Sequence, residues 1–342
     1  MVLSGLLLKV PYSIIWMFLK YTNQLHPFVF YCADIQDYRA FENVIPYLKI
    51  KPEIVAKNRK IREELKGIGV QSKTWPVFPE NVVMVRHALH KFPIKKIFKI
   101  GMRHGPYHFK QFIKKELYNS FDIFLFTSAE EVKSAREFGI NTGKNGGYPK
   151  IESFRSKRVQ QKANALQEKY NNGKIKLLFS ATYDESGMSA IERWYDKLAG
   201  LSENYQIFVT LHPFMSPRYE KVLSQNKDIV LVKQNDLMAY MLLSDILISD
   251  TSSIIGEYCS LDKPIITFKV KKASRLCDEI VEIISNISIQ IDDVSELNSA
   301  IKKYLKNPSL KKEERQKCNN ILFYDLKKNH GKKTAKIINK HL

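Results

Sequence analysis

Residues 247–268 of the chain read LISDTSSIIGEYCSLDKPIITF. The segment begins with a short apolar run, continues through five polar residues (249–253) and becomes a helical pattern near Ile254. A second apolar run, 265–268, ends it. A short apolar run, a helix and another short apolar run are typical of a strand–helix–strand unit in a parallel sheet.

The same alternation extends along the rest of the chain. Short apolar runs typical of buried parallel strands alternate with helical patterns such as 109–118, 129–138 and 190–199. The predicted strands are 28–32, 82–85, 97–100, 123–126, 177–179, 207–211, 229–232, 246–248 and 265–268. We therefore predict an α/β protein of two Rossmann-like, doubly wound domains that face a cleft. Ligands bind such sheets outside the carboxyl ends of their strands.

The clearest break in composition lies at residues 153–172, which are polar and charged and are followed by Gly173. We predict a surface helix or linker at this break. It separates an N-terminal domain over 1–155 from a second domain over 173–300. A basic helical tail is expected over 301–342, and its first helix pattern begins with Ser295 as the predicted cap.

Composition restricts the class of protein. The hydrophobic fraction of 44% and the aromatic fraction of 11% are those of a globular protein, and 342 residues suffice for about two domains. The four cysteines lack the CxxC spacing of a zinc site and do not form a disulfide framework, which fits a reducing compartment. They are Cys32, Cys259, Cys277 and Cys318.

The chain is strongly basic. It has 55 Lys and Arg against 35 Asp and Glu, a formal net charge of +20, and residues 301–342 alone hold 13 basic and 3 acidic residues. This charge favours an anionic partner, such as an acidic membrane face or a phosphorylated substrate, although a solvated lysine-rich helix face also explains the tail. The Gly/Arg/Ser bias and the aromatic–basic motif of nucleic-acid binders are missing, so we predict no nucleic-acid partner.

The amino terminus is apolar but interrupted. Residues 2–19 read VLSGLLLKVPYSIIWMFL, with Lys9 and Pro11 inside the run. The run is too short and too broken for a spanning helix, which needs about 20 apolar residues. It also lacks the basic start and the small-residue cleavage site of a secretory signal.

We predict instead an amphipathic helix over residues 2–20 that lies on the inner face of the cell membrane. The predicted apolar contacts are Trp16, Phe18 and residues 6–8, and the predicted headgroup contacts are Lys9 and Lys20. An ordinary buried first helix fits the same residues, and the sequence leaves both interpretations open.

Polar residues cluster where the predicted strand 246–248 meets the helix that begins near Ile254. Residues 249–253 supply four hydroxyls and one carboxylate, and Glu257 follows one turn into the helix. A helix start carries unpaired N–H groups and the positive end of the dipole, which suits phosphate. Plain N-capping needs only one such residue, so five in a row favour a phosphate site.

A histidine follows another predicted strand in Thr210-Leu211-His212-Pro213-Phe214. At the carboxyl end of a strand, a histidine can face the cleft and donate a hydrogen bond to phosphate or exchange a proton. A single histidine is more often structural, so His212 by itself is a weak signal.

A second histidine segment, IGMRHGPYHFK, covers residues 100–110 between a predicted strand and a helical pattern. Its Gly105 and Pro106 favour a tight turn that exposes His104. Arg103 and Lys110 would add positive charge beside that histidine. A basic surface turn without a function is the alternative interpretation.

Together these segments resemble the signature of the CDP-glycerol glycerophosphotransferases, which build teichoic acids and phosphate-containing capsules. ISDTSSIIGEYCSLDKPIITF resembles the family's Ser/Thr-Asp-Tyr-Ser-Ser block with its helix and Lys-Pro-Ile-Ile strand, LHPF its His-Pro element, and MRHGPYHFK its His-Gly element. GYPK at 147–150 resembles its Gly-Tyr-Pro-Arg turn, and NDL at 235–237 precedes the signature at the expected distance. Order and spacing agree over residues 95–270.

Some positions differ from the family pattern. Thr251 stands where the family has an aromatic residue, and Arg103 stands where it has a tryptophan. The family's Pro-Thr-Trp-Arg element corresponds here to SATY at 180–183.

The resemblance implies a GT-B fold and the transfer of an alditol phosphate, such as glycerol phosphate, from a CDP-activated donor. The acceptor would be a hydroxyl of a lipid-linked or polymeric glycan, and CMP would be released. Residues 1–155 would hold the acceptor and 173–300 the donor. By the family pattern His104 is the general base and His212 steadies the phosphate under attack. The implied donor-binding residues are Asp250, Thr251, Ser252, Ser253 and Glu257, and the implied phosphate or acceptor contacts are Arg103, Gly105 and Lys110.

No His, Cys or Asp group has clear metal-ligand spacing, so we predict no tightly bound metal, while Mg²⁺ held loosely on the donor pyrophosphate is compatible. Two other functions stay open. One is a GT-B nucleotide-sugar glycosyltransferase or UDP-sugar 2-epimerase-like enzyme, and the other is a basic scaffold. We expect a cytoplasmic enzyme of cell-surface polymer biosynthesis that is peripherally associated with the inner face of the cell membrane.

Overall fold

The computed structural model describes residues 2–106, 112, 114–271, 276 and 278–342. These residues divide into two compact units. Unit 1 holds 2–106, 112, 114–152 and 323–342, and unit 2 holds the described residues between 153 and 322. The break in composition at 153–172 thus begins where unit 2 begins. The expected tail over 301–342 is divided, because the chain returns to unit 1 at Phe323.

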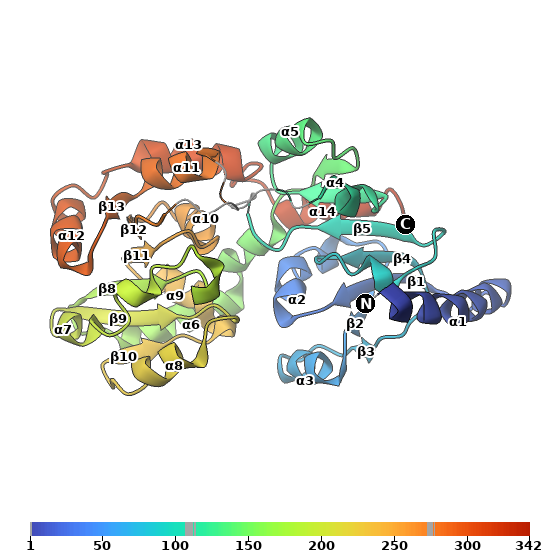
Figure 1. Ribbon diagram of the computed structural model, residues 1–342, viewed down its shortest axis with the longest axis horizontal. Coiled ribbons are helices and arrows are strands. Elements are labelled where there is room, and N and C mark those ends of the chain that lie inside the picture. The colour runs from blue at the N-terminus through green and yellow to red at the C-terminus, as the bar shows by residue number, and fades with distance from the viewer. Residues whose placement is uncertain (1, 107–111, 113, 272–275, 277) are drawn as a thin grey trace. The chain divides into compact units, whose positions relative to one another are not determined.

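Unit 1 contains a parallel sheet with the strand order β3–β2–β1–β4–β5–β6–β7 (Figure 1). The strands are β1 (His26–Cys32), β2 (Glu53–Ala56), β3 (Lys73–Thr74), β4 (Pro79–Met84), β5 (Phe98–Met102), β6 (Ile123–Phe126) and β7 (Gly143–Asn145). The predicted strands within β1, β4, β5 and β6 are confirmed. The edge strands β3 and β7 escaped prediction because they are short and polar, as edge strands often are.

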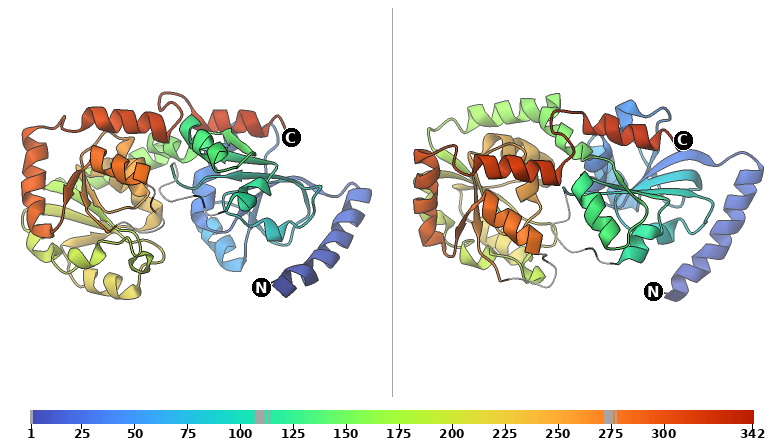
Figure 2. Two further views of the ribbon diagram at one scale, coloured as in Figure 1. Left: turned by 45° about the horizontal axis from the view of Figure 1, so that its top comes forward. Right: turned by 90° about the horizontal axis from the view of Figure 1, so that it is seen from above.

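Helices cover both faces of this sheet. Residues of β1 alternate between two cores, with Phe28 and Phe30 on one face and Val29 and Tyr31 on the other, which explains a continuous apolar run. One face carries α2 (Ile35–Phe41), α3 (Arg59–Gly67) and α14 (His330–Ile338), and the other carries α1 (Val2–Tyr21), α4 (Lys115–Asn119) and α5 (Ala129–Glu137). Figure 2 shows α1 and α14 on opposite sides of the sheet. Short 3₁₀ turns are η1 (Ile45–Tyr47), η2 (Leu89–Lys91) and η3 (Pro149–Arg155).

Unit 2 repeats this plan with the strand order β10–β9–β8–β11–β12–β13. The strands are β8 (Ile175–Ser180), β9 (Tyr205–Thr210), β10 (Ile229–Leu231), β11 (Ile246–Ser249), β12 (Ile265–Phe268) and β13 (Ile289–Ile291). The helices are α6 (Lys157–Lys169), α7 (Leu198–Ser202), α8 (Pro217–Leu223), α9 (Leu237–Leu243), α10 (Ile254–Cys259), α11 (Asp278–Ile287), α12 (Leu297–Lys306) and α13 (Lys312–Leu322). The 3₁₀ turns are η4 (Asp184–Ser186), η5 (Ile191–Arg193), η6 (Gln234–Asp236) and η7 (Val294–Glu296).

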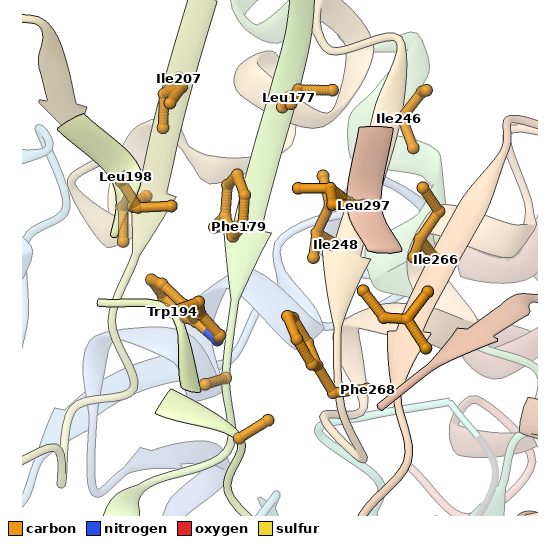
Figure 3. Packing of buried hydrophobic residues seen from close by; sticks show 14 of the residues in the cluster. Leu177, Phe179, Trp194, Leu198, Ile207, Ile246, Ile248, Ile266, Phe268 and Leu297 are labelled. Atoms are coloured by element: carbon orange, nitrogen blue, oxygen red, sulfur yellow. The ribbon is translucent and has the colours of Figure 1, made fainter. Parts of the chain in front are cut away.

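One core cluster of unit 2 packs against one face of its sheet (Figure 3). Phe179 of β8 and Trp194 meet with ring centroids 5.1 Å apart, and Leu297 of α12 packs in the same cluster. A helix was predicted over 190–199, but only 191–193 (η5) and the residues from Leu198 on (α7) are helical there. The side chain of Trp194, which lies between them, is buried in the core.

The cap before α12 also differs from the prediction. Asp293, not Ser295, caps the turn, because its carboxylate accepts the N–H of Ser295 at 2.9 Å. The carboxylate of Glu296 in turn accepts the N–H of Asp293 at 3.0 Å, which completes a capping box. Of the predicted helix over 109–118, residues 109–111 and 113 lie outside the described residues, and α4 begins at Lys115.

Candidate active site

Both sheets reverse their strand order at one point, between β1 and β4 in unit 1 and between β8 and β11 in unit 2. Doubly wound sheets bind ligands outside the carboxyl ends of the strands at this point. In unit 2 the two strands end at Ser180 and Ser249. The polar residues 250–253 therefore begin at the position where a ligand is expected.

Asp250 ties together the loops at this position. Its carboxylate accepts the N–H and the hydroxyl of Thr182, each at 3.0 Å, and the N–H of Ala190 at 3.0 Å. The N–H of Ser252 donates to it at 3.1 Å, and that of Thr251 also donates to it. Burial raises the pKa of Asp250, while the N–H groups of Ala190 and Thr182 oppose that rise. One buried carboxylate thus connects three segments.

Thr251 is buried beside Asp250. Its hydroxyl donates to the carbonyl of Met188 at 3.2 Å and lies 3.1 Å from the hydroxyl of Thr182. Asp250 and Thr251 therefore hold the conformation of the loop through hydrogen bonds to buried protein groups. Their predicted contact with a donor stays a prediction.

Ser252 and Ser253 are the more accessible residues of the loop, with Ser252 half-buried and Ser253 exposed. Ser253 stands at the cap of α10 without using its side chain as a cap. The loop has fewer available backbone donors than the sequence suggests, because the N–H groups of Thr251 and Ser252 are bonded to Asp250. Glu257 is buried within α10. The two serine hydroxyls are consequently the groups best placed to meet an anion.

His212 follows β9, the neighbour of β8. Its Nδ1 accepts the N–H of Phe214 at 3.1 Å. A backbone N–H is always a donor, so Nδ1 is unprotonated and the proton of the neutral ring is on Nε2. In that tautomer Nε2 can donate to a phosphate oxygen.

Two aromatic residues flank His212. The ring centroid of Tyr183, which follows β8, lies 5.1 Å from that of His212. The ring centroid of the exposed Phe214 lies 5.3 Å from that of His212. Sequence reasoning did not include Tyr183, although its place in SATY, the counterpart of the related family's Pro-Thr-Trp-Arg element, was the available signal.

Side chains from the segments that follow the neighbouring strands hold the His212 loop. Gln234 donates to the carbonyl of Leu211 at 2.7 Å and to the hydroxyl of Thr210 at 3.2 Å. The carboxylate of Asp184 accepts both the N–H and the hydroxyl of Ser216. The loops after β8, β9, β10 and β11 are thereby joined in one framework within unit 2.

In unit 1, His104 and Gly105 follow β5, and the side chain of His104 is exposed. The hydroxyl of Tyr148 donates to the carbonyl oxygen of His104 at 3.1 Å. Gly105 is half-buried, and Lys110 lies outside the described residues. The exposure of His104 agrees with the prediction made from Gly105 and Pro106.

Arg103, predicted to add positive charge beside His104 and to contact phosphate or acceptor, is itself held by an ion pair. Its Nε lies 2.8 Å from Oε1 of the fully buried Glu131, and only 10% of its side chain is exposed. Its guanidinium also lies over the ring of Phe126, 5.2 Å from the centroid. Glu131 is held in turn by the N–H of Thr127 at 2.9 Å. This ion pair anchors the residue directly before His104, and a phosphate contact of Arg103 stays a prediction.

An ion pair that sequence reasoning missed lies where the order of the unit 1 sheet reverses. Nε of Arg86, which follows β4, lies 2.9 Å from Oδ1 of Asp37, and the N–H of Ala33 donates to Asp37 at 2.9 Å. Burial raises the pKa of Asp37 to about 6, although Arg86 acts in the opposite direction. The signal for this pair was an acidic residue and an arginine soon after two predicted strands.

His104 belongs to unit 1 and His212 to unit 2, so their predicted convergence on one diphosphate stays a prediction. Among the described residues, no cluster of three or more His, Cys, Asp or Glu side chains is arranged to hold a metal ion.

The first helix divides its apolar residues between two faces. Tyr12 and Trp16 are buried, with the hydroxyl of Tyr12 donating to the carbonyl of Val77 at 2.7 Å and Nε1 of Trp16 to that of Pro79 at 2.8 Å. The predicted membrane contact of Trp16 is therefore wrong. The opposite face is exposed and consists of Val10, Ile14, Met17, Phe18 and Tyr21, which we call the outer face of α1.

The outer face follows a helical spacing of three to four residues, so it forms one apolar stripe. In the described part of the chain, no helix combines the length and the apolar character needed to cross a bilayer.

Comparison with known proteins adds to this geometry. The family model described as CDP-Glycerol:Poly(glycerophosphate) glycerophosphotransferase matches residues 81–338. A curated relative, the teichoic acid glycerol-phosphate primase of Bacillus subtilis (strain 168), is 27% identical over 201 residues. That alignment covers 54% of this chain and 49% of the relative, so the chain spans about half the length of the curated protein it matches.

Solved structures share the fold. A variant of the wall teichoic acid polymerase TagF, soaked with CDPG, has a TM-score of 0.67 at 14% identity and covers 99% of this chain and 95% of its own. The UDP-GlcNAc 2-epimerase from Neisseria meningitidis, bound to UDP-GlcNAc, has a TM-score of 0.60 at 12% identity, with coverage of 92% and 98%. At these identities the likeness concerns the fold alone, and it confirms the predicted α/β architecture of the GT-B type.

Proposed function

Because the chain belongs to the CDP-glycerol:poly(glycerophosphate) glycerophosphotransferase family, we propose that it transfers glycerol phosphate or a similar alditol phosphate from a CDP-activated donor. The acceptor is a hydroxyl of a lipid-linked or polymeric glycan, and CMP is the second product. The observation that carries the proposal is the joined framework in unit 2, which presents Ser252, Ser253 and an oriented His212 around the point where the strand order reverses.

In this proposal the donor diphosphate binds to unit 2. The hydroxyls of Ser252 and Ser253 donate to its oxygens, and Nε2–H of His212 donates to the phosphate under attack. Asp250 and Thr251 act indirectly because their polar atoms are bonded to the protein. Phosphoryl transfer depends mainly on positioning and on hydrogen-bond donors around the charged centre, which is what such a loop supplies.

The chemical step uses His104 as a general base. Its imidazole takes the proton of the acceptor hydroxyl while that oxygen attacks the phosphorus that carries the alditol. The bond from this phosphorus to the bridging oxygen breaks, and CMP leaves with the electron pair. Proton transfer by a positioned side chain contributes roughly 10²–10⁴-fold. The exposed position of His104 on a turn anchored at Arg103 supports this role.

The sequence-based prediction about metals is part of the proposal. No metal is held tightly, and Mg²⁺ associates with the donor pyrophosphate when it is present. Dialysis of the protein against EDTA before the assay tests this point. Turnover that vanishes after dialysis and returns with one equivalent of metal would contradict it.

We also propose that the protein associates peripherally with the acidic inner face of the cell membrane through the outer face of α1. Supporting features are the exposed apolar stripe, the exposed Lys9 and Lys20 on the same helix, and the net charge of +20. Interfacial helices bind by apolar burial together with attraction to anionic lipid.

The test of the function is direct. The full chain is incubated with CDP-glycerol or CDP-ribitol and a short synthetic glycan acceptor, and CMP and acceptor mass are measured. In parallel, CDP, CMP, UDP and GDP are compared by thermal shift, since a nucleotide at 100 times its Kd stabilises by about 2.7 kcal/mol. Stabilisation by UDP alone, without CMP release, would favour a UDP-sugar enzyme and overturn the proposal.

A further inference from the structure

The last helix of the chain holds the turn that follows β7. The N–H of Tyr148 donates to Nδ1 of His330 at 2.9 Å, and the hydroxyl of Thr334 donates to the carbonyl of Gly146 at 2.8 Å. Between them Gly147 has φ of +80°, and a Cβ at this position would lie 3.1 Å from Nδ1 of His330. The turn 146–148 and α14 therefore fit closely although they are far apart in the sequence.

His330 has one tautomer in this arrangement. Its Nδ1 accepts a backbone N–H, so the proton lies on Nε2, which donates to the carbonyl of Asp325 at 3.1 Å. The backbone N–H of His330 donates to the carboxylate of Glu152 at 2.9 Å. The ring is fully buried, so the contact that holds Tyr148 is shielded from water.

The side chain of Tyr148 extends the contact to the candidate site. Tyr148 is buried, and its hydroxyl donates to the carbonyl oxygen of His104 at 3.1 Å. Because β5, β6 and β7 are neighbours in the sheet, the tyrosine reaches from the end of β7 past β6 to the turn after β5. His104 is thus fixed at its carbonyl by Tyr148 and at the preceding residue by the Arg103–Glu131 ion pair.

We propose that Tyr148 is a positioning residue for His104. Its hydroxyl holds the backbone from which the exposed imidazole of His104 extends, and His330 holds Tyr148 in place. This inference rests on the proposed function, in which His104 is the general base. Buried partners that restrict an exposed reactive group are a common way to hold it within the geometry that proton transfer requires. The inference gives the GYPK turn at 147–150 and helix α14 a part in catalysis.

The first test compares Tyr148→Phe with Tyr12→Phe in the full chain. Both substitutions remove one hydrogen bond from a buried tyrosine hydroxyl to a backbone carbonyl in unit 1, to His104 in one case and to Val77 in the other. Tyr12 lies on the buried face of α1, where its hydroxyl donates to Val77 and its ring packs against Phe78. With a water-soluble acceptor, Tyr148→Phe is expected to lower kcat by about 10-fold with an unchanged KM for CDP-glycerol, and Tyr12→Phe to keep the wild-type kcat.

A second readout needs no donor. The protein is labelled with ¹³C-histidine, and the ring signal of His104 is assigned from its loss in His104→Ala. The proposal expects that this signal shifts and that its pH titration changes in Tyr148→Phe but not in Tyr12→Phe. A signal and titration that match the wild type in Tyr148→Phe overturn the proposal, whatever the turnover is.

Equal losses of kcat in the two variants would also overturn it, because they would reflect a general loss of stability. The two proposals can fail separately. If the wild type releases no CMP while the His104 signal still responds to Tyr148→Phe, the proposed function is contradicted. The inference that Tyr148 positions His104 is then still supported.

Discussion

The carboxylate of Asp250 accepts two hydrogen bonds from Thr182, one from the backbone N–H and one from the hydroxyl, each at 3.0 Å. This contact joins the ends of β8 and β11 at the point where the strand order of unit 2 reverses. The serines that follow Asp250 are positioned by the same carboxylate, because the N–H of Ser252 donates to it as well. A residue that resembles a ligand in the sequence is therefore the centre of the loop framework.

Replacement of Asp250 by Asn is expected to loosen this framework. The amide has one acceptor oxygen, and its NH₂ group would face backbone donors such as the N–H of Ala190. We expect a loss of about 1–3 kcal/mol in the free energy of unfolding in urea, as for a buried group left unsatisfied. The exposed Asp228→Asn is the control. Identical unfolding midpoints for the two variants would contradict the structural role of Asp250.

The two histidines should be needed for turnover and dispensable for folding. His104→Ala and His212→Ala are each expected to lower CMP release from CDP-glycerol by at least about 100-fold, because neither the proton acceptor nor the phosphate donor can be replaced by a methyl group. The thermal midpoint should stay near that of the wild type, since neither side chain is fully buried. His90→Ala, at an exposed position of η2, is the control. Full turnover in either variant would contradict the role proposed for that histidine.

Asp37 should make stability depend on pH. Its pKa in the folded protein is about 6, above its ordinary value of 3.8, because burial outweighs Arg86. The folded state therefore holds a proton that the unfolded state has lost between pH 4 and pH 6, so stability is lost as the pH rises through this window. Relative to Asp37→Asn, the wild type should lose up to about 3 kcal/mol between pH 4 and pH 7. A difference between the two proteins that stays flat over this range would contradict the expectation.

Membrane binding should depend on the outer face of α1. Ile14→Ser combined with Phe18→Ser is expected to reduce co-sedimentation with vesicles that contain anionic lipid, without a change in the thermal midpoint, because both side chains are exposed. The matched control is Leu305→Ser, an exposed leucine of α12 in unit 2. Equal sedimentation of the double variant and the control would contradict this surface assignment.

The two lysines of α1 allow a separate test of whether membrane binding depends on anionic lipid. Lys9→Gln and Lys20→Gln should each weaken binding to acidic vesicles by about 1 kcal/mol, or roughly fivefold, and should leave binding to neutral vesicles unchanged. A loss that is the same on both kinds of vesicle would argue against attraction to anionic headgroups.

Local pattern was a good guide to the elements themselves. Within residues 247–268 the predicted strand, helix start and second strand agree with β11, α10 and β12. The strand 28–32 was visible because both faces of a central parallel strand are buried, so each of its residues is apolar. Strands such as Gly143–Asn145 were not visible, since three residues at a sheet edge, of sequence Gly-Lys-Asn, carry no such pattern.

The orientation of polar and aromatic side chains could not be predicted from the local sequence pattern. Arg103 was expected to add charge beside His104 and pairs with the buried Glu131, while Trp16 was expected to contact a membrane and is buried within unit 1. In each case the deciding partner comes from another element. A helix or turn of this composition is equally compatible with either orientation until that partner is in place.

The sequence alone determined the α/β class, the positions of most central strands and the polar residues 249–253. Each of these depends on neighbouring residues, through the burial of a parallel strand or the chemistry of a helix start. Only the tertiary structure decided that Asp250 turns inward to Thr182 and that the chain returns to unit 1 so that His330 meets Tyr148. Those contacts join residues 68 and 182 positions apart. Hydrogen bonds over such separations depend on how the whole chain folds, which no local periodicity encodes.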